Sequence, residues 1–152
     1  MARPSLLTCS LLVATLALAS VVTRAGEGAA VRDAGRYAVH YNAMPSDELD
    51  AGLAERYGLP HSGDRCVVTV AVMDKESGSA VRARVMGSAT RPDGRMHHVE
   101  MREIRDEGGV YYVGELPIES SAELEFKLEI RPSPASAPQT IRFTRRFEPP
   151  GG

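Results

Sequence analysis

The sequence has no tryptophan, few aromatic residues and only two cysteines, Cys9 and Cys66. Aromatic residues make up 5% of the 152 positions, and the 18 Lys and Arg residues form no basic block. A nucleic-acid surface combines positive charge with aromatic side chains that stack on bases, so these absences argue against one. If Cys9 leaves with an export leader, as argued below, the one remaining cysteine excludes a structural zinc site of the paired-cysteine kind.

Sequence patterns typical of catalysis are missing as well. There is no glycine-rich phosphate loop, no nucleophile elbow and no paired-histidine zinc motif. Cys66 stands in a strongly apolar segment, whereas a reactive thiolate needs an accessible, electropositive setting. We therefore predict that the protein is not an enzyme and that it has no catalytic residues and no cofactor.

The first residues have the pattern of an export leader. Arg3 supplies a positive charge, residues 6–19 form a largely apolar run, and residues 17–19 read Ala-Leu-Ala, the small-x-small pattern that a signal peptidase cuts. The apolar run of about 14 residues is short of the roughly 20 that span a bilayer, so cleavage is favoured over a retained anchor. We predict a signal peptide at residues 1–19, with a cut after Ala25 as the alternative, and a periplasmic mature protein without a membrane span.

Cleavage would leave Cys66 as the only thiol, because Cys9 leaves with the leader. An intrachain disulfide is then impossible, and Cys66 has two possible roles: a buried apolar thiol or a bridge to another chain. Val67, Val68 and Val70 follow it in a strand-like run, which favours burial.

From residue 36 onward the dominant hydrophobic period is two, as in half-buried strands. The clearest case is residues 123–131, where Leu124, Phe126, Leu128 and Ile130 alternate with charged side chains. A helix would scatter these four apolar residues around its circumference, whereas a strand places them on one face.

Seven segments show strand patterns, and several of the connections between them carry the Gly, Pro and Asp residues of tight turns. They cover residues 37–41, 66–73, 81–85, 99–104, 110–116, 123–131 and 140–147. So many short strands cannot stay in one flat sheet without exposing an apolar face. We predict an all-β, seven-stranded antiparallel immunoglobulin-like sandwich over residues 35–148, between a flexible N-terminus at 20–34 and a flexible tail at 149–152.

One short helix is expected after the first of these strands. Asp50 is a suitable N-cap, Leu53, Ala54 and Tyr57 form an apolar stripe, and Gly58 stands where a left-handed residue ends a helix. We expect this helix to plug one open end of the sandwich.

The four histidines suggest a metal-handling alternative. His97 and His98 are adjacent, so on a regular strand their side chains face opposite ways and cannot share one metal ion. His40 and His61 remain as candidate copper or zinc ligands, with methionines such as Met44 and Met96 as further donors. A solvated or hydrogen-bonded histidine is the simpler interpretation, so no metal site is predicted.

Several segments resemble, in order and spacing, the motifs of the domain-of-unknown-function 4426 family. They are residues 35–43, 57–59, 102–105 and 110–113. Members of that family are small exported bacterial proteins without an assigned activity, so the resemblance implies a periplasmic location. Five positions that match these motifs, or lie just downstream of one, are candidate interaction residues: His40, Asn42, Arg65, Arg102 and Glu103.

Two hypotheses for function follow from the sequence. The first is an exported, noncatalytic β-sandwich that binds an unidentified protein or envelope component. The second is a periplasmic metal-handling protein that uses His and Met residues. For the first hypothesis, Arg102 is the better recognition candidate, because Glu103 shares a strand face with Val99 and Met101 and should be partly buried beside a cationic partner.

Overall fold

The computed structural model describes residues 29–119, 122–132 and 136–148. The leader expected at residues 1–19 and the tail at 149–152 lie outside these ranges. The elements are β1 (Ala30–Ala34), β2 (Tyr37–Pro45), a 3-10 turn (Ser46–Glu48), α1 (Ala51–Tyr57), β3 (Arg65–Asp74), β4 (Arg84–Thr90), β5 (Met96–Val99), β6 (Arg102–Asp106), β7 (Gly109–Pro117), β8 (Ala122–Arg131) and β9 (Gln139–Phe147).

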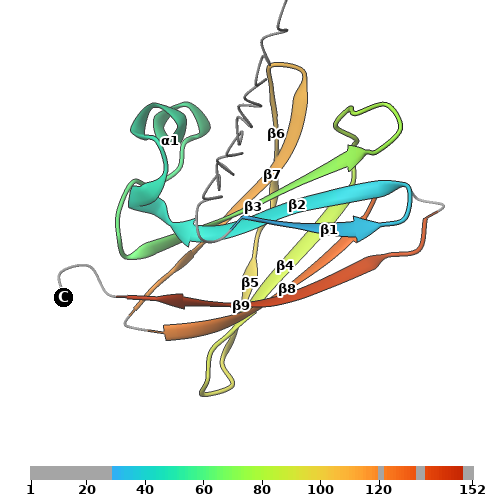
Figure 1. Ribbon diagram of the computed structural model, residues 1–152. Coiled ribbons are helices and arrows are strands. Elements are labelled where there is room, and N and C mark those ends of the chain that lie inside the picture. Colours follow the sequence, from blue (N-terminus) through green and yellow to red (C-terminus); the bar gives the residue numbers. More distant parts are fainter. Residues whose placement is uncertain (1–28, 120–121, 133–135, 149–152) are drawn as a thin grey trace, which may run out of the picture.

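The strands form two antiparallel sheets that pack face to face as a sandwich (Figure 1). One sheet has five strands in the order β1-β2-β3-β7-β6, and the other has four in the order β5-β4-β8-β9. The all-β sandwich predicted from the sequence is therefore confirmed. Within the described ranges, no helix has the length and apolar character needed to cross a membrane.

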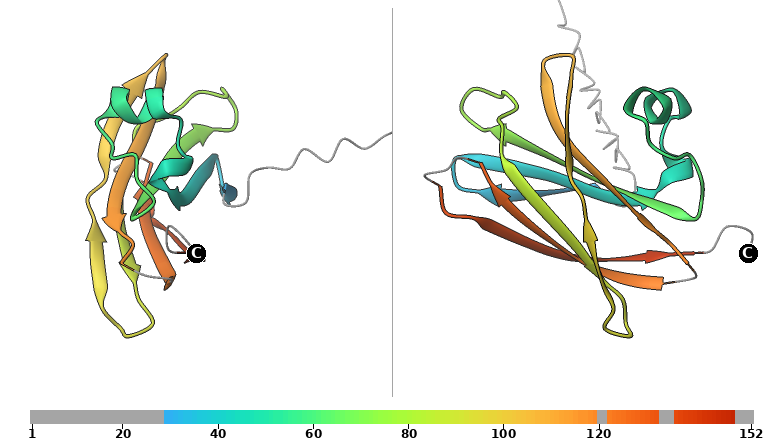
Figure 2. Two further views of the ribbon diagram at one scale, coloured as in Figure 1. Left: turned by 90° about the vertical axis from the view of Figure 1, so that its left-hand side faces the viewer. Right: turned by 180° about the vertical axis from the view of Figure 1, so that it is seen from behind.

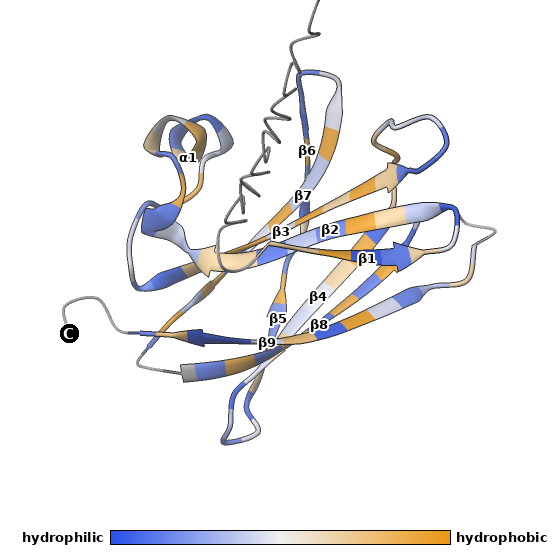
Figure 3. Ribbon diagram, viewed as in Figure 1, coloured by the Kyte–Doolittle hydropathy of each residue, from blue (hydrophilic) through white to orange (hydrophobic). Residues whose placement is uncertain are grey.

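The core lies between the sheets and is built by alternation along the strands, which Figure 3 shows as alternating hydropathy. In β8 the four apolar side chains picked out by the sequence pattern are all buried. Phe126 of β8 stacks on Phe143 of β9 at a centroid distance of 5.0 Å, and Phe143 also contacts Tyr41 of β2 at 4.9 Å. These rings join the four-stranded sheet to the five-stranded sheet.

The predicted single strand at 99–104 is wrong. Val99 ends β5 in the four-stranded sheet, and the chain then crosses to begin β6 in the five-stranded sheet (Figure 2). Two glycines make room for this crossing: a Cβ at Gly114 would lie 2.5 Å from Cγ1 of Val99, and one at Gly87 would lie 3.1 Å from its Cβ. A pattern of alternating residues does not reveal a change of sheet, because both halves still alternate.

The start of the domain also differs from the prediction. Residues 30–34, assigned to a flexible N-terminus, form β1, which pairs with β2 through a turn at Gly35 with a φ of 70°. Its sequence, Ala-Val-Arg-Asp-Ala, carries too few large apolar residues to show a strand period. The described part of the chain thus holds nine strands instead of seven, and the immunoglobulin-like detail is not confirmed.

Cys66 is fully buried in the core on β3, which settles the choice between burial and a bridge in favour of burial. Burial away from water raises the pKa of its thiol to about 12. The thiolate is therefore scarce at neutral pH.

Candidate functional site

Helix α1 forms where the sequence predicts it, but it does not plug an end of the sandwich. The carboxylate of Asp50 accepts a hydrogen bond from the backbone N–H of Leu53 at 3.0 Å, and Gly58 adopts a left-handed conformation with a φ of 61°. Ala54 and Leu59 pack in a small apolar cluster that includes Val67, Val113 and Ile104. Val67 and Val113 lie on the outer face of the five-stranded sheet, so the helix covers part of that face and leaves the rest open.

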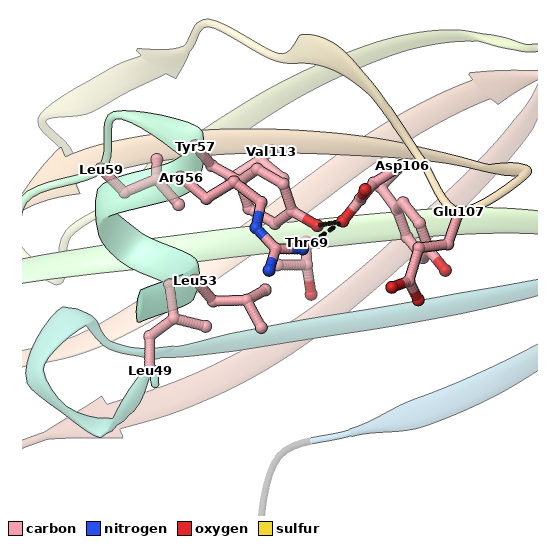
Figure 4. Close-up of a pocket in the computed structure, with 10 residues that line it drawn as sticks. Leu49, Leu53, Arg56, Tyr57, Leu59, Thr69, Asp106, Glu107 and Val113 are labelled. Carbon is pink, nitrogen blue, oxygen red and sulfur yellow. Dashed lines mark hydrogen bonds and ion pairs between the residues drawn. The ribbon is translucent and has the colours of Figure 1, made fainter. Parts of the chain in front are cut away.

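A hollow of about 560 Å³ lies between α1 and the β6–β7 hairpin (Figure 4). Its floor is the outer face of the sheet at Thr69 and Val113. Two of its walls carry apolar side chains that water reaches: Leu53 of α1 is 37% exposed and Tyr111 of β7 is 43% exposed. The volume is in the range of about 300–1,000 Å³ typical of ligand pockets.

A three-residue polar cluster closes one side of this hollow. The Tyr57 hydroxyl donates to Oδ2 of Asp106 at 2.6 Å, and Nη1 of Arg56 donates to the same oxygen at 3.0 Å. The hydrogen bond from Tyr57 has the larger effect on Asp106 and that from Arg56 the next, and both lower the pKa of the Asp106 carboxyl group. The same two bonds raise the pKa of Tyr57 and of Arg56. Each group is held in its ordinary charge state, so the cluster is suited to fixing the helix against the hairpin and not to proton transfer.

A second hollow of about 420 Å³ adjoins the first and shares Thr69 and Tyr111 with it. It is bounded by β1 and β2, where Val31 is 60% exposed and His40 and Asn42 face outward. We call the two hollows together the sheet groove. It runs from α1 across the outer face of the five-stranded sheet to β1.

The structure brings together two of the five candidate interaction residues. His40 and Asn42 both line the sheet groove, and Oδ1 of Asn42 is buried without a hydrogen-bond partner among the described residues. This oxygen offers an acceptor to a bound group, because a buried polar atom left unpaired is costly.

The other three candidates have separate surroundings. Arg65 pairs with Glu115 at 3.4 Å, and Nη2 of Arg102 donates to the backbone carbonyl of Tyr57 at 3.3 Å. The Glu103 carboxylate lies 2.8 Å from Arg105 and 3.3 Å from Arg82, so the expected cationic partners are present. The pKa of Glu103 is lowered, mainly by the hydrogen bond from Arg105 and also by Arg82.

The two histidines proposed as metal ligands also have different neighbours. His40 faces the sheet groove, while Nε2 of His61 lies 3.0 Å from the backbone carbonyl of Leu49. Within the described ranges, no group of three or more His, Cys, Asp or Glu side chains could hold a metal ion.

Sequence reasoning missed several residues of the groove. Tyr111 lies within the strand expected at 110–116, Val31 lies in the segment expected to be flexible at 20–34, and Asp106 lies in the connection between the strands expected at 99–104 and 110–116. The sequence does carry one usable signal, since Leu53 and Tyr57 lie on the apolar stripe of the predicted helix. What it does not show is which sheet face that stripe covers.

Residues 31–148 match the family described as Domain of unknown function (DUF4426). The crystal structure of a family protein from Pseudomonas aeruginosa shares 31% sequence identity and a TM-score of 0.70 with this chain. The likeness covers 80% of this chain and 96% of that one. No curated protein matches the chain.

The fold is also similar to that of FetP from uropathogenic Escherichia coli strain F11. The as-isolated protein shares 10% identity at a TM-score of 0.59, over 80% of this chain and 95% of FetP. A copper-bound variant of FetP shares 8% identity at a TM-score of 0.59, over 80% and 96% of the two chains. At these identities the likeness concerns the fold alone.

Proposed function

This chain belongs to the DUF4426 family, and we propose that it is a noncatalytic binding module that works in the periplasm. Its sheet groove holds an extended segment of a partner protein that carries apolar side chains next to a Lys or Arg. One observation carries the proposal. Of the five large apolar side chains exposed in the described residues, three line this groove: Val31, Leu53 and Tyr111.

The apolar character of the groove supports a binding role. Single exposed apolar residues are common on soluble proteins, but contiguous ones mark surfaces that another molecule covers. Tyr111 lines both hollows, so it can contact a ligand in either of them. A buried tyrosine at the centre of an interface is a frequent source of binding energy.

The shape of the groove favours a polypeptide over a compact small molecule. The two hollows lie side by side along one sheet face and are joined at Thr69 and Tyr111. An extended segment can place alternate side chains into successive hollows, as strands do when they bind along a surface. The unpaired Asn42 Oδ1 in the second hollow can accept a hydrogen bond from such a segment.

The charge at the hairpin end points to a basic group in the partner. Arg56 is already paired with Asp106, whereas the Glu107 carboxylate makes no ion pair among the described residues. Glu107 lines the groove and is exposed, in the turn between β6 and β7. A Lys or Arg of the partner would complete this end of the groove.

The absence of catalysis and the periplasmic location are parts of the same proposal. Arg56, Tyr57 and Asp106 of the groove are tied to one another, and the Cys66 thiol is buried in the core, so none of these groups offers an activated nucleophile. The location rests on the leader pattern in residues 1–19.

Site-specific photo-crosslinking in the native periplasm tests the proposal. Benzoylphenylalanine at position 111 should give a crosslinked protein adduct, and the same group at position 142, on the outer face of the four-stranded sheet, should not. The captured partner should then bind the purified protein. Tyr111→Ser should weaken that binding more than about tenfold, and Glu107→Lys should weaken it most at low salt.

Both variants change exposed side chains, so the free energy of unfolding should move by less than about 0.5 kcal/mol. Equal crosslinking from both positions, or a partner that binds Tyr111→Ser as tightly as the natural protein, would refute the groove as the binding site.

Metal handling is the second candidate, and what supports it is that FetP, which shares the fold, has a variant with a copper-bound structure. His40 and His61, the ligands considered from the sequence, have separate surroundings. Titration of copper or zinc into the natural protein and a His40→Ala, His61→Ala double variant tests that pair. Loss of tight, stoichiometric binding in the variant would support it.

A further inference from the structure

Two arginines of the four-stranded sheet lie directly opposite each other. Arg84 begins β4, Arg131 ends β8, and the two are paired in the antiparallel register. The Cβ atoms of such a pair are about 4.5–5.5 Å apart, and like charges at these positions destabilise the strand pair. A third arginine, Arg82, precedes Arg84 by two residues. This end of β4 therefore concentrates positive charge.

The three arginine side chains point away from the core on the outer side of the four-stranded sheet. The residues that alternate with Arg82 and Arg84 pack against the core, and both arginines are exposed. On β8 the residue before Arg131 is fully buried, and Arg131 itself is exposed. The three arginines and Glu103 of β6 line one hollow of about 330 Å³, which Ala83 and Pro132 complete.

Two of the three arginines have no counter-charge in the described part of the chain. Nε of Arg82 lies 3.3 Å from Oε2 of Glu103, and that carboxylate also pairs with Arg105 at 2.8 Å. Arg84 and Arg131 have no ion pair and no side-chain hydrogen bond with any described residue.

Neither nearby carboxylate is free to balance that charge. Glu129, two residues before Arg131 on the same face of β8, is engaged by Lys127. Glu103, in the hollow itself, is shared between two arginines and the hydroxyl of Tyr112. The hollow thus keeps a positive charge that an anion from outside can balance.

The backbone that carries these arginines is fixed before any ligand arrives. The N–H of Ala83, between Arg82 and Arg84, donates to the Tyr112 hydroxyl at 2.7 Å. Arg84 and Arg131 are held by the pairing of β4 with β8, and Pro132 directly after Arg131 is buried. A ligand would therefore have to order only the ends of the arginine side chains, which favours binding.

We propose that Arg82, Arg84 and Arg131 form a binding site for a phosphate group, either free phosphate or a phosphomonoester on a larger molecule. Guanidinium groups bind phosphate and carboxylate oxygens through paired N–H donors. Here three such groups approach one hollow from three backbone positions. A tetrahedral phosphate presents oxygens in several directions, whereas a flat carboxylate presents only two in one plane, so phosphate suits this arrangement better.

Glu103 has a positioning role in this site. It was singled out as a candidate interaction residue from the sequence, and it lines the hollow with its carboxylate bound to Arg82. The site shares no residue with the sheet groove. Failure of one of the two proposals therefore leaves the other standing.

Calorimetric titration with inorganic phosphate, at an ionic strength held constant with sodium chloride, tests the site. The natural protein should bind one equivalent of phosphate. Arg84→Gln and Arg131→Gln should each bind it more than about tenfold more weakly, because each removes charge-assisted hydrogen bonds. Phosphate should also raise the Tm of the natural protein and leave the Tm of the two variants unchanged.

The stability of the two variants without phosphate separates binding from a structural role. Arg131→Gln removes one of two like charges from a strand pair, so its urea midpoint in phosphate-free buffer should equal or exceed that of the natural protein. A lower midpoint, together with unchanged phosphate affinity, would show that Arg131 serves the fold instead.

A control arginine and a second source of phosphate complete the test. Arg142→Gln changes an exposed arginine of the same sheet that pairs with Glu125, so it should keep the phosphate affinity of the natural protein. Sedimentation with phosphatidylcholine vesicles, with and without phosphatidic acid, tests a phosphomonoester on a lipid. Binding in either arm that Arg131→Gln weakens supports the site and identifies the source. Absence of binding in both arms, or equal weakening by Arg142→Gln, would overturn the proposal.

Discussion

The backbone N–H of Ala83 donates a hydrogen bond to the phenol oxygen of Tyr112 at 2.7 Å. Tyr112 is buried on β7 of the five-stranded sheet, and Ala83 directly precedes β4 of the four-stranded sheet. The same hydroxyl donates to Oε2 of Glu103 at 3.3 Å. A single side chain therefore anchors the connection by which the chain passes from one sheet to the other.

Tyr112→Phe should destabilise the protein by about 1–3 kcal/mol. The change leaves the Ala83 N–H without its acceptor while the ring still fills the core, so the loss reports the hydrogen bond. Urea unfolding measures it, and Tyr111→Phe is the matched control, because that ring is exposed and should cost less than about 0.5 kcal/mol. Equal stabilities of the two variants would contradict the anchoring role.

Gly114→Ala should cost about 1–3 kcal/mol, since the new methyl group would overlap Val99 where the chain changes sheet. Val99→Ala removes the atom that comes closest. In a Val99→Ala background, Gly114→Ala should therefore cost clearly less than it does alone. A double-mutant cycle by chemical denaturation gives this coupling, and strictly additive costs would show that the two positions do not interact.

The Cys66 thiol should resist modification in the native protein. Its pKa of about 12 leaves little thiolate near neutral pH, and burial blocks the reagent. We expect an aromatic disulfide reagent to label Cys66 only in denaturant, with the labelling read by absorbance and mass spectrometry. Fast, stoichiometric labelling of the folded mature protein would place this cysteine at an accessible position.

Asp74 should make stability depend on pH. Its carboxylate accepts hydrogen bonds from the backbone N–H of Ser77, from Arg36 at 2.6 Å and from the backbone N–H of Glu76. These bonds lower the pKa of Asp74 below its ordinary 3.8. The hydrogen bond from Ser77 has the largest effect, and that from Arg36 has the next largest. The folded state thus favours the ionised carboxylate, and the resulting stability is present above pH 3.8 and is lost as the pH falls through the lower folded value.

Asp74→Asn should therefore be less stable than the natural protein at neutral pH, and the difference should shrink as acid protonates Asp74. Denaturation curves at several pH values measure this difference. Glu76→Gln is the control, because that side chain is exposed and lies 4.0 Å from Arg36. A stability difference that stays constant with pH would assign the effect of Asp74→Asn to packing and not to charge.

The sequence predicts the strand content of the fold well where one face of a strand is buried. Residues 123–131 show this, because the period of two reports burial directly and needs no knowledge of neighbours. The separation of β5 from β6 could not be predicted in this way, since it depends on the space left by Gly87 and Gly114 on other strands. β1 escaped prediction for a different reason: its five residues, Ala-Val-Arg-Asp-Ala, include only one large apolar side chain, so they show no period of two.

The candidate sites were predicted less completely. His40 and Asn42 were singled out through the family resemblance, and they do line the sheet groove. Their neighbour Tyr111 lies far along the chain and comes beside them only through the order of the strands β2, β3 and β7. In the same way, Arg84 and Arg131 become neighbours through the pairing of β4 with β8, a register that single-sequence patterns do not fix.

The crossing from β5 to β6 also bears on how the domain opens. Both are edge strands, one in each sheet, and edges are where a sheet normally frays first and where foreign strands add on. Here each edge continues into the other within the short step from Val99 to Arg102. Neither edge can peel away without straining the opposite layer, so we expect amide hydrogen exchange in β5 and β6 to occur together, as one cooperative unit that includes both sheets.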